Sequence, residues 1–348
     1  MTEAEGTGSK MAIIQCDSLS KVFVSNAKKP GLFGLVRSLF SNENMEKLAI
    51  DRLSFEIEPG EIVGYIGANG AGKSTTIKIM TGILTPSAGS CVVNGIIPYE
   101  RRMENAKQIG VVFGQRTQLW WDLPLIESFA VLKTIYEVSD SDYEQRMREL
   151  DEILGISEFM HQTVRTLSLG QRMRADLAAA LIHNPPILYL DEPTIGLDVM
   201  VKDRIREAIR RMNRQFNTTV ILTTHDMSDI EELCNHIIVI DNGRKIFDGT
   251  PEELKNRYRY LSRIIVQIDP KGKAPEEIID NINAELDVDS VKETAGGLAI
   301  EFDKSVTPAK KIIDYVFEKY DATEFSVNNV DLGMIVRDIY KDGIHDES

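Results

Sequence analysis

Cysteine is scarce in this sequence of 348 residues, which contains only Cys16, Cys91 and Cys234. The three lie far apart along the chain, and no C-x-x-C spacing occurs. A disulfide framework needs more cysteines, and a zinc site needs closely spaced ligands. The scarcity therefore argues against both kinds of site and favours a reducing compartment.

Long apolar runs are also missing. No stretch approaches the uninterrupted apolar length of about 18 residues that predicts a membrane-spanning helix. The first ten residues are polar and glycine-rich, so no secretory signal is expected there. Residues 1–11 are instead predicted to be a disordered leader.

Basic side chains are in the minority. Lys and Arg number 40 against 54 Asp and Glu, which leaves a formal net charge of −14. Surfaces that bind nucleic acid are dominated by basic side chains, so this balance argues against a nucleic-acid partner. Hydrophobic residues make up 43% and charged residues 27%, as in an ordinary globular protein.

The order of predicted elements divides the chain into at least two domains. Residues 12–254 contain apolar strand patterns separated by helical patterns. Strands that alternate with helices of this length predict a parallel sheet with helices on both faces. The strands are expected at 12–16, 53–57, 62–66, 187–190 and 219–223, and the helices within 122–184 and at 199–214.

Residues 255–348 follow a different order. Strand patterns at 263–268, 288–293, 298–302 and 324–327 are separated by helical patterns at 275–286 and 308–320. A last helical pattern begins at 331. The β-α-β-β-α-β order predicts a small ferredoxin-like α+β domain.

A glycine-rich loop follows the apolar strand at 62–66 and matches G-x-x-x-x-G-K-[ST]. Glycines let successive backbone N–H groups point at phosphate oxygens, and the next helix aims its positive N-terminus at the same anion. Lys73 is expected to reach the β- and γ-phosphates, and Ser74 to ligate Mg²⁺. The nucleotide-binding residues of this P-loop are Gly67, Ala68, Asn69, Gly70, Ala71, Gly72, Lys73, Ser74 and Thr75.

Two carboxylates end the strand at 187–190. Buried carboxylates are costly unless they have a charge partner, so Asp191 and Glu192 indicate metal and water chemistry. Asp191 is expected to hold Mg²⁺ through water, and Glu192 to orient or deprotonate the attacking water. The alternative is an acidic turn that opens the next loop.

The signature at 167–171, Leu-Ser-Leu-Gly-Gln, decides between P-loop families. With it, the chain resembles the nucleotide-binding subunit of an ABC transporter over residues 12–254. Within that family, the run at 115–124, which contains Trp120 and Trp121, and the Leu-Ser-Leu-Gly-Gln form of the signature resemble the ABC-2 type exporter ATPases. The motifs stand in the family's order: Phe23, the P-loop, Gln115, the signature, Asp191 with Glu192, Asp198 and His225.

The resemblance implies a P-loop NTPase ABC cassette with a mixed sheet, a RecA-like core and a helical subdomain at 122–184. Phe23 matches the aromatic that stacks on adenine, although a core aromatic is the alternative. Gln115 matches the glutamine whose amide oxygen ligates Mg²⁺, although it can also be an ordinary polar loop residue. His225 matches the switch histidine at the γ-phosphate.

The resemblance also implies that one chain does not complete its own site. Ser168, Gly170 and Gln171 belong to the signature loop, which contacts the γ-phosphate bound by the opposite subunit. Asp198 matches the loop that crosses to the partner's site. Leu169 stands where glycine is commoner, so the loop is expected to work with less conformational freedom.

Residues 26–47 lengthen the distance between Phe23 and the P-loop beyond that of compact cassettes. Apolar residues within this insertion recur at helical spacing, at 32, 35, 36, 39 and 40, beside the basic Lys28, Lys29 and Arg37. We expect an amphipathic helix that leans on the membrane surface or a permease, or that packs on its own domain.

The sequence therefore predicts an ATP-binding and ATP-hydrolysing subunit of a membrane transporter, of the exporter type. The expected partners are a separate multi-span permease and a second cassette, as a homodimer, and the chain itself is expected at the cytoplasmic side of the cell membrane. ATP and Mg²⁺ are the expected ligands. The alternatives are a soluble ABC ATPase that does not transport and a regulatory module that only binds nucleotide.

Overall fold

A computed structural model describes residues 12–26, 44–113, 116–257, 262–269, 274–294, 297–304, 306–329 and 332–342. The predicted leader at 1–11, the insertion between 27 and 43, and Gln115 lie outside these residues. The chain divides into a first unit, Met1–Gly249, and a second unit, Thr250–Ser348. In the described ranges, no helix has both the length and the apolar character needed to cross a membrane.

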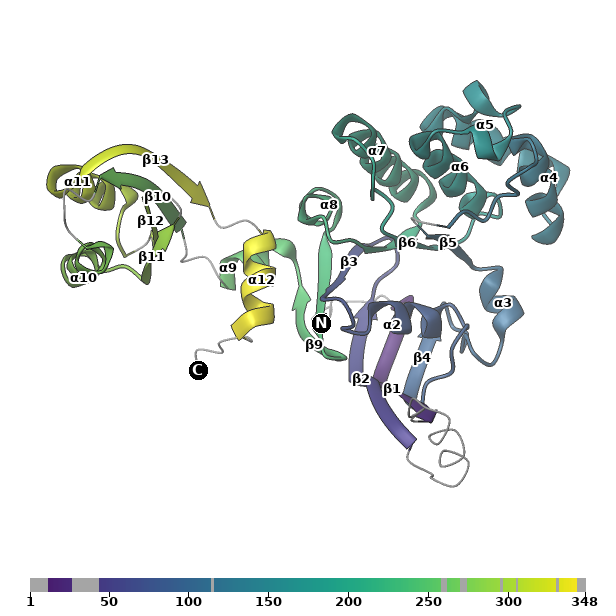
Figure 1. Ribbon diagram of the computed structural model, residues 1–348. Coiled ribbons are helices and arrows are strands. Elements are labelled where there is room, and N and C mark those ends of the chain that lie inside the picture. Colours follow the sequence, from purple (N-terminus) through teal and green to yellow (C-terminus); the bar gives the residue numbers. More distant parts are fainter. Residues whose placement is uncertain are drawn as a thin grey trace, which may run out of the picture. The chain divides into compact units, whose positions relative to one another are not determined.

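The first unit is built on a six-stranded sheet of order β5-β6-β7-β3-β8-β9 (Figure 1). Its neighbouring strands are parallel except for β8 and β9. β3 and β7 are buried along their whole length, as expected of apolar strands covered on both faces. The strands are β3 (Ile62–Gly67), β5 (Ile109–Phe113), β6 (Ile187–Asp191), β7 (Thr219–Thr223), β8 (His236–Asp241) and β9 (Arg244–Gly249).

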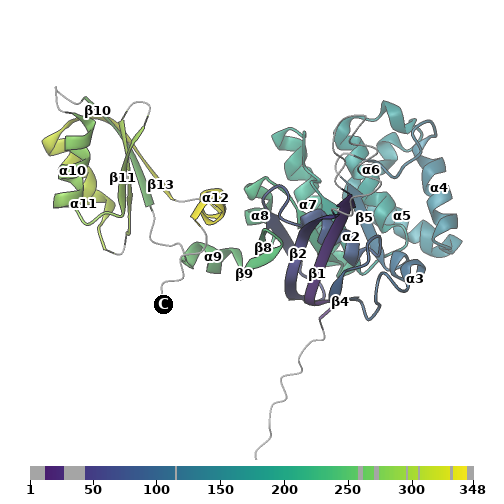
Figure 2. The same ribbon diagram turned by 60° about the horizontal axis from the view of Figure 1, so that its bottom comes forward.

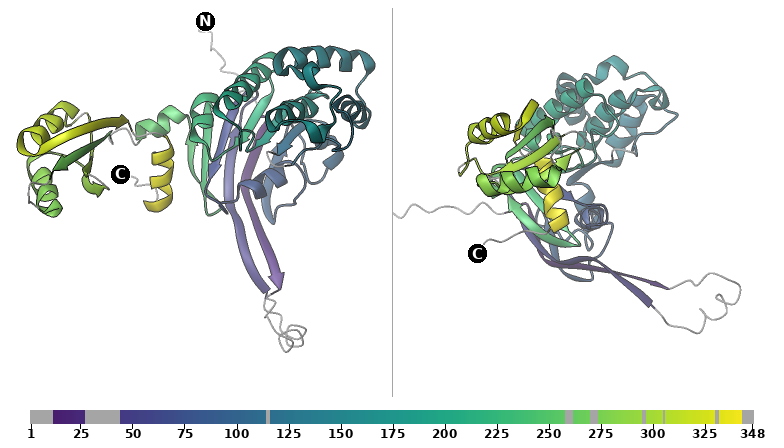
Figure 3. Two further views of the ribbon diagram at one scale, coloured as in Figure 1. Left: turned by 45° about the horizontal axis from the view of Figure 1, so that its top comes forward. Right: turned by 60° about the vertical axis from the view of Figure 1, so that its left-hand side comes forward.

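A second, antiparallel sheet of order β2-β1-β4 joins β1 (Ile14–Asn26), β2 (Asn44–Ile57) and β4 (Ala88–Val93). β4 pairs with β1 only as far as Ser20. Beyond that point β1 pairs with β2, and the two continue as a long two-stranded arm (Figure 3). Phe23 lies opposite Lys47 in this arm.

The helices expected between 122 and 184 are present and lie together (Figure 1). α6 packs against both α4 and α5. They are α4 (Leu125–Ile135), α5 (Asp140–Leu154) and α6 (Leu169–Leu181), with short 3₁₀ turns at Ile156–Phe159 and Val164–Thr166. The other helices of this unit are α2 (Lys73–Met80), α3 (Arg102–Ala106), α7 (Val199–Phe216) and α8 (Met227–Leu233).

One apolar core joins the two sheets of the first unit and holds α2 between them. It includes Leu19 of β1, Tyr65 of β3, Ile79 of α2 and Tyr189 of β6, each at most 1% exposed. The Tyr65 hydroxyl donates a hydrogen bond to Oγ1 of Thr76 at 3.1 Å, which ties α2 to β3. The helix that follows the glycine-rich loop is therefore held in place by the apolar core and by its hydrogen bond to β3.

The second unit contains an antiparallel sheet of order β11-β12-β10-β13, with α10 and α11 together on one face (Figure 2). This confirms the predicted ferredoxin-like domain. α9 (Pro251–Arg257) precedes the sheet, and α12 packs against α9. The remaining elements are β10 (Ser262–Asp269), α10 (Pro275–Glu285), β11 (Ser290–Thr294), β12 (Gly297–Phe302), α11 (Ala309–Lys319), β13 (Asp321–Asn329) and α12 (Leu332–Asp342).

Candidate functional site

The glycine-rich loop joins β3 to α2 and wraps around the side chain of Lys73. Gly72, just before α2, has a φ of 113°, in the left-handed region that favours glycine. A Cβ atom there would lie 2.8 Å from the carbonyl oxygen of Ala49. The Nζ atom of Lys73 donates to the carbonyl oxygens of Gly67 and Ala68, the second at 3.2 Å. An ammonium group and a helix N-terminus thus share one loop, which suits an anion.

A cavity of about 380 Å³ opens over this loop. Its walls come from the β1–β2 arm, the P-loop, the end of β6 and the segment after β7. Gly67 and Ala71 face inward instead, since a Cβ atom at Gly67 would lie 2.8 Å from Ile240 and Ala71 is 3% exposed. The predicted residues that line the cavity are Phe23, Ala68, Asn69, Gly70, Gly72, Lys73, Ser74, Thr75, Asp191, Glu192 and His225.

The arm contributes an aromatic ring and a cation to this cavity. Phe23 is 39% exposed, so it is not the buried core aromatic that the sequence left as an alternative. The Nζ atom of Lys21 lies 5.4 Å from the centre of the Phe23 ring. Lys47, the cross-strand neighbour of Phe23, also lines the cavity. Ring and ammonium groups together match a flat, anionic ligand.

The end of β6 places two carboxylates beside the P-loop. Asp191 ends β6 opposite Thr223 of β7, whose hydroxyl donates to Oδ1 of Asp191 at 2.5 Å. The next residue, Glu192, has a φ of 56°, which is uncommon outside glycine, and its N–H donates to the carbonyl oxygen of Thr223 at 2.9 Å. This turn brings Oε1 of Glu192 within 3.3 Å of Nε2 of His225.

Burial shifts the pKa of two groups in this cluster, Glu192 and Lys73. It raises the pKa of Glu192 above the usual value, and Asp191 adds to the rise, whereas His225 and Lys73 oppose it. It also lowers the pKa of Lys73, which Glu192 and Asp191 oppose. A carboxylate of raised pKa accepts a proton more readily, as a general base must.

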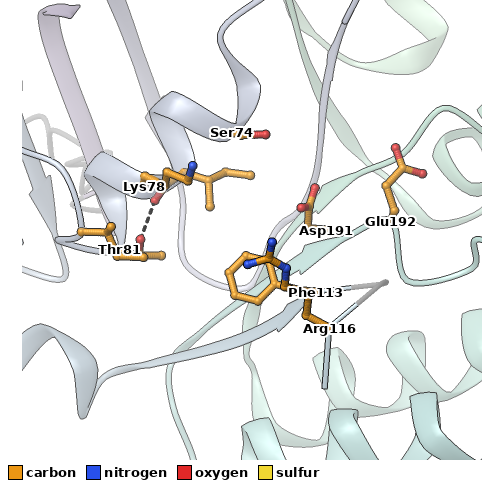
Figure 4. A pocket seen from close by; sticks show the side chains of 9 residues that line it. Ser74, Lys78, Thr81, Phe113, Arg116, Asp191 and Glu192 are labelled. Atoms are coloured by element: carbon orange, nitrogen blue, oxygen red, sulfur yellow. Dashed lines mark hydrogen bonds between the residues drawn. The ribbon is translucent and has the colours of Figure 1, made fainter. Parts of the chain in front are cut away.

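A second cavity, of about 560 Å³, is also lined by these carboxylates (Figure 4). Ser74 at the start of α2 faces the end of β6, where Asp191 and Glu192 lie. All three residues line both cavities. Phe113 and Arg116, on either side of the undescribed pair 114–115, line the second cavity, which also has the apolar Ile77 and Ile83. Gln115 itself lies outside the described residues.

The signature residues lie elsewhere and do not line the cavity over the P-loop. Ser168 caps α6, with Oγ accepting from the N–H of Gln171 at 3.2 Å and Oε1 of Gln171 accepting from the N–H of Ser168 at 2.9 Å. Asp198 caps α7 in the same way, accepting from the N–H of Val201 at 3.0 Å. A Cβ atom at Gly170 would lie 2.8 Å from Val201, so the two helix starts are neighbours.

Sequence reasoning missed several residues around the site. Lys47 could be found only from the strand register that places it beside Phe23. Thr223 was inside a predicted strand, but its bond to Asp191 depends on which strands are neighbours. Asp229 on α8 accepts hydrogen bonds from Thr194 and Thr224, which lie close to Glu192 and His225 in the chain. No sequence motif includes Asp229.

The sequence of the first unit matches the family described as ABC transporter over residues 50–195. The linearmycin resistance ATP-binding protein LnrL of Bacillus subtilis is 30% identical over 287 residues, 82% of this chain and 89% of that protein. The ABC transporter ATP-binding protein NatA of the same organism is 33% identical, over 65% of this chain and 94% of that protein. The Nod factor export ATP-binding protein I of Cupriavidus metallidurans is 36% identical, over 63% and 70%.

Solved structures share the fold. cbiO1 from Clostridium perfringens, part of the ABC transporter complex cbiONQ, superposes with a TM-score of 0.58 at 24% identity, covering 79% of this chain and 96% of that one. The ATP-binding cassette MJ0796, solved as a dimer bound to ADP and Pi, gives 0.55 at 24% identity, over 68% and 98%. These similarities confirm the predicted cassette fold.

Proposed function

This chain belongs to the family of ABC transporter ATP-binding proteins and is a transport ATPase; on that premise we propose that it powers an exporter by closing a head-to-tail dimer around ATP. One observation carries the proposal. Lys73, Asp191, Glu192 and His225 line one cavity, while the signature helix start and Asp198 lie outside it. Each chain thus carries two half-sites, and a second copy supplies Ser168 to the nucleotide held by Lys73.

The residues of the cavity divide the chemistry between them. Lys73 and the N-terminus of α2 bind the phosphates, and Phe23 holds the base by stacking. Glu192, with its raised pKa, takes the proton of the attacking water. His225, 3.3 Å from Glu192, steadies that carboxylate and the γ-phosphate. Hydrolysis then breaks the bond between the β-phosphate oxygen and the γ-phosphorus, and the dimer reopens.

The donors near Lys73 fit a magnesium ion. The Ser74 hydroxyl and the Asp191 carboxylate line the same two cavities, and both are hard oxygen ligands. Mg²⁺ in nucleotide sites is usually held by one or two protein oxygens together with phosphates and water. When bound, it supplies positive charge against the phosphates; Gln115 is proposed as a further ligand from the resemblance alone.

The proposal also covers the direction of transport and the membrane partner. Similar proteins are named for linearmycin resistance and for Nod factor export, which supports an exporter, although a methionine import protein is also similar. We propose that a separate multi-span permease binds this chain at the cytoplasmic face of the membrane, beside the 560 Å³ cavity. Trp120 and Trp121, 38% and 47% exposed, are further candidate contacts for the permease.

The substitution Glu192→Gln tests the catalytic assignment. It keeps the shape of the side chain but removes its basicity, so ATP binding should persist while turnover falls by at least about a hundredfold. The variant should run as a dimer in size-exclusion chromatography with Mg²⁺ and ATP, and as the smaller species without nucleotide. Lys73→Ala, which should not bind ATP, is the control. Hydrolysis by Glu192→Gln at the parental rate would show that the assignment is wrong.

The membrane partner is tested separately. The tagged chain should co-purify with a multi-span protein from gently solubilised membranes, and ATP turnover should rise when the two are reconstituted. Co-purification with ribosomes instead would favour the soluble ATPase alternative.

A further inference from the structure

A buried carboxylate connects the two chain segments that carry Glu192 and His225. Asp229 lies on α8 and is 0% exposed. Its Oδ2 atom accepts a hydrogen bond from the hydroxyl of Thr194 at 2.5 Å and another from the hydroxyl of Thr224 at 3.0 Å. Both threonines are buried, at 2% and 1% exposed. One oxygen atom is therefore shared by two loops.

The two threonines lie close to the proposed catalytic residues in the chain. Thr194 follows Glu192 by two residues, at the start of the loop that leads to Asp198. Thr224 directly precedes His225, which is more than half exposed at its side chain. Since packing restrains the His225 ring little, the backbone at Thr224 decides where the ring lies. Neighbouring groups must likewise hold the backbone at Glu192, because its positive φ is an uncommon conformation outside glycine.

The other oxygen of Asp229 anchors the carboxylate itself. Its Oδ1 atom accepts from Nε of Arg206 on α7 at 2.7 Å. Arg206 is 5% exposed and also donates to Glu232 at 2.9 Å and to Asp203 at 3.1 Å. A charged pair buried to this extent persists only when its hydrogen bonds are satisfied, and its geometry is then well defined. Asp229 is thus a rigid reference point between α7 and α8.

We propose that Asp229 is a positioning residue for hydrolysis, which fixes the spacing between Glu192 and His225 through the hydroxyls of Thr194 and Thr224. The inference rests on the proposed roles of Glu192 and His225. It assigns Asp229 no contact with ATP. Loss of either hydroxyl should leave nucleotide binding intact and slow the chemical step, because the general base and the histidine then sample a wider range of separations.

The threonines, rather than Asp229, are the positions to change, since removing a buried charge partner of Arg206 can unfold the protein. Thr194→Val and Thr224→Val keep the side-chain shape and delete one hydroxyl each. The control is Thr219→Val, at the opposite end of β7, where an equally buried hydroxyl accepts from the N–H of Gly60 at 2.9 Å. The Thr224 hydroxyl also accepts from the N–H of Asp226 at 3.0 Å, so the thermal stability of all three variants is measured alongside.

The readout is the division between kcat and KM for ATP. Thr194→Val and Thr224→Val should each lower kcat about tenfold with KM changed less than about twofold, and Thr219→Val should leave both near the parental values. The double variant should be little slower than either single one, because both hydroxyls act through the same oxygen. Unchanged kcat in the first two variants, or an equal loss in Thr219→Val, would overturn the proposal.

Glu192→Gln measured alongside separates this inference from the function on which it rests. If Glu192→Gln is inactive and the threonine variants are fully active, Glu192 is the base and the positioning role of Asp229 is wrong. If Glu192→Gln hydrolyses ATP at the parental rate, the catalytic role proposed for Glu192 is wrong. A loss of kcat in the threonine variants would then point to a different general base.

Discussion

At the scale of single residues, burial decides the behaviour of charged groups that composition treats alike. Asp176 on α6 is 4% exposed, and burial raises its pKa to about 6. Hydrogen bonds from the hydroxyl of Thr117 and the N–H of Gln118, at 2.7 and 3.3 Å, lower the pKa in part, as does the charge of Arg172. Asp176 therefore ties the segment after Gln115 to the signature helix at a cost in stability.

That cost predicts a pH dependence for the substitution Asp176→Asn. The folded-state pKa lies above the unfolded value of 3.8, so the folded protein binds this proton more tightly. The favourable contribution is complete below pH 3.8 and is lost as the pH rises through about 6, by about 3 kcal/mol in all. Asparagine cannot ionise, and its oxygen can accept both hydrogen bonds, so the variant should unfold at a higher temperature than the parent at pH 8.

The measurement is the melting temperature of both proteins between pH 4.5 and pH 8. The difference should be several degrees at pH 8 and should shrink toward pH 4.5. Asp122→Asn, which changes an exposed aspartate whose side chain is 79% accessible, is the matched control and should show no such trend. A difference that is constant over this pH range would contradict the burial argument.

At the scale of elements, the β1–β2 arm predicts an effect on nucleotide affinity. Phe23→Ala should weaken ATP binding about tenfold, because base–aromatic stacking contributes about 1–3 kcal/mol. Stability should change little, since the ring is 39% exposed. Calorimetric titration of the Glu192→Gln background with Mg²⁺ and ATP measures the affinity without turnover.

Two further substitutions on the arm make that result specific. Val24 is the next residue of β1, is 58% exposed and points to the opposite face of the strand, so Val24→Ala should leave affinity unchanged. Phe23→Trp should keep it, since any aromatic face can stack. Equal affinity in Phe23→Ala and the parent would remove Phe23 from the nucleotide site.

The same scale shows which elements the sequence could predict. β3, the P-loop and α2 were predictable because an apolar run is followed directly by the G-x-x-x-x-G-K-[ST] pattern, which is typical of a phosphate-binding loop between a strand and a helix. β8 and β9 were not predicted, although the run at 237–240 and the following Asn242-Gly243 turn indicate a hairpin. The signature at 167–171 was predicted for its function, and the structure adds a local role, since Ser168 and Gln171 form a capping box at the start of α6.

The candidate site was predictable in its residue types and not in its supports. Lys73, Asp191, Glu192 and His225 belong to motifs whose chemistry needs those side chains. Lys47, Thr223 and Asp229 act through neighbours on other strands and helices, so only strand order and register reveal them. A single hydroxyl or ammonium group has no spacing that marks it along the chain.

At the scale of the whole molecule, the two units have separate apolar cores, one built around α2 and the other between α10, α11 and their sheet. We therefore expect two transitions in calorimetry of the full chain. Mg²⁺ and ATP, added to the Glu192→Gln variant at about a hundred times the dissociation constant, should stabilise the unit that binds them by about 2.7 kcal/mol. The transition of the first unit should shift upward by several degrees, and the other should stay in place.

The control is the same scan with Lys73→Ala, in which neither transition should move. A single transition that shifts as a whole would mean that the units unfold together. The order of elements in the second unit was predictable because the apolar residues of its strands and of its helices recur at the spacing typical of each. Its role was not, since its residues carry no motif whose chemistry names a ligand.

The separation of the signature helix start from the cavity over the P-loop has a genetic consequence. If two copies pair as proposed, a defect at Ser168 spares the nucleotide of the chain that carries it and harms the nucleotide of the partner chain. Two different defective alleles, one at Ser168 and one at Lys73, can then share a dimer in which one composite site is wholly normal and the other carries both lesions. Two alleles that are each inactive alone can therefore complement each other, because activity depends on an intact composite site and not on an intact chain.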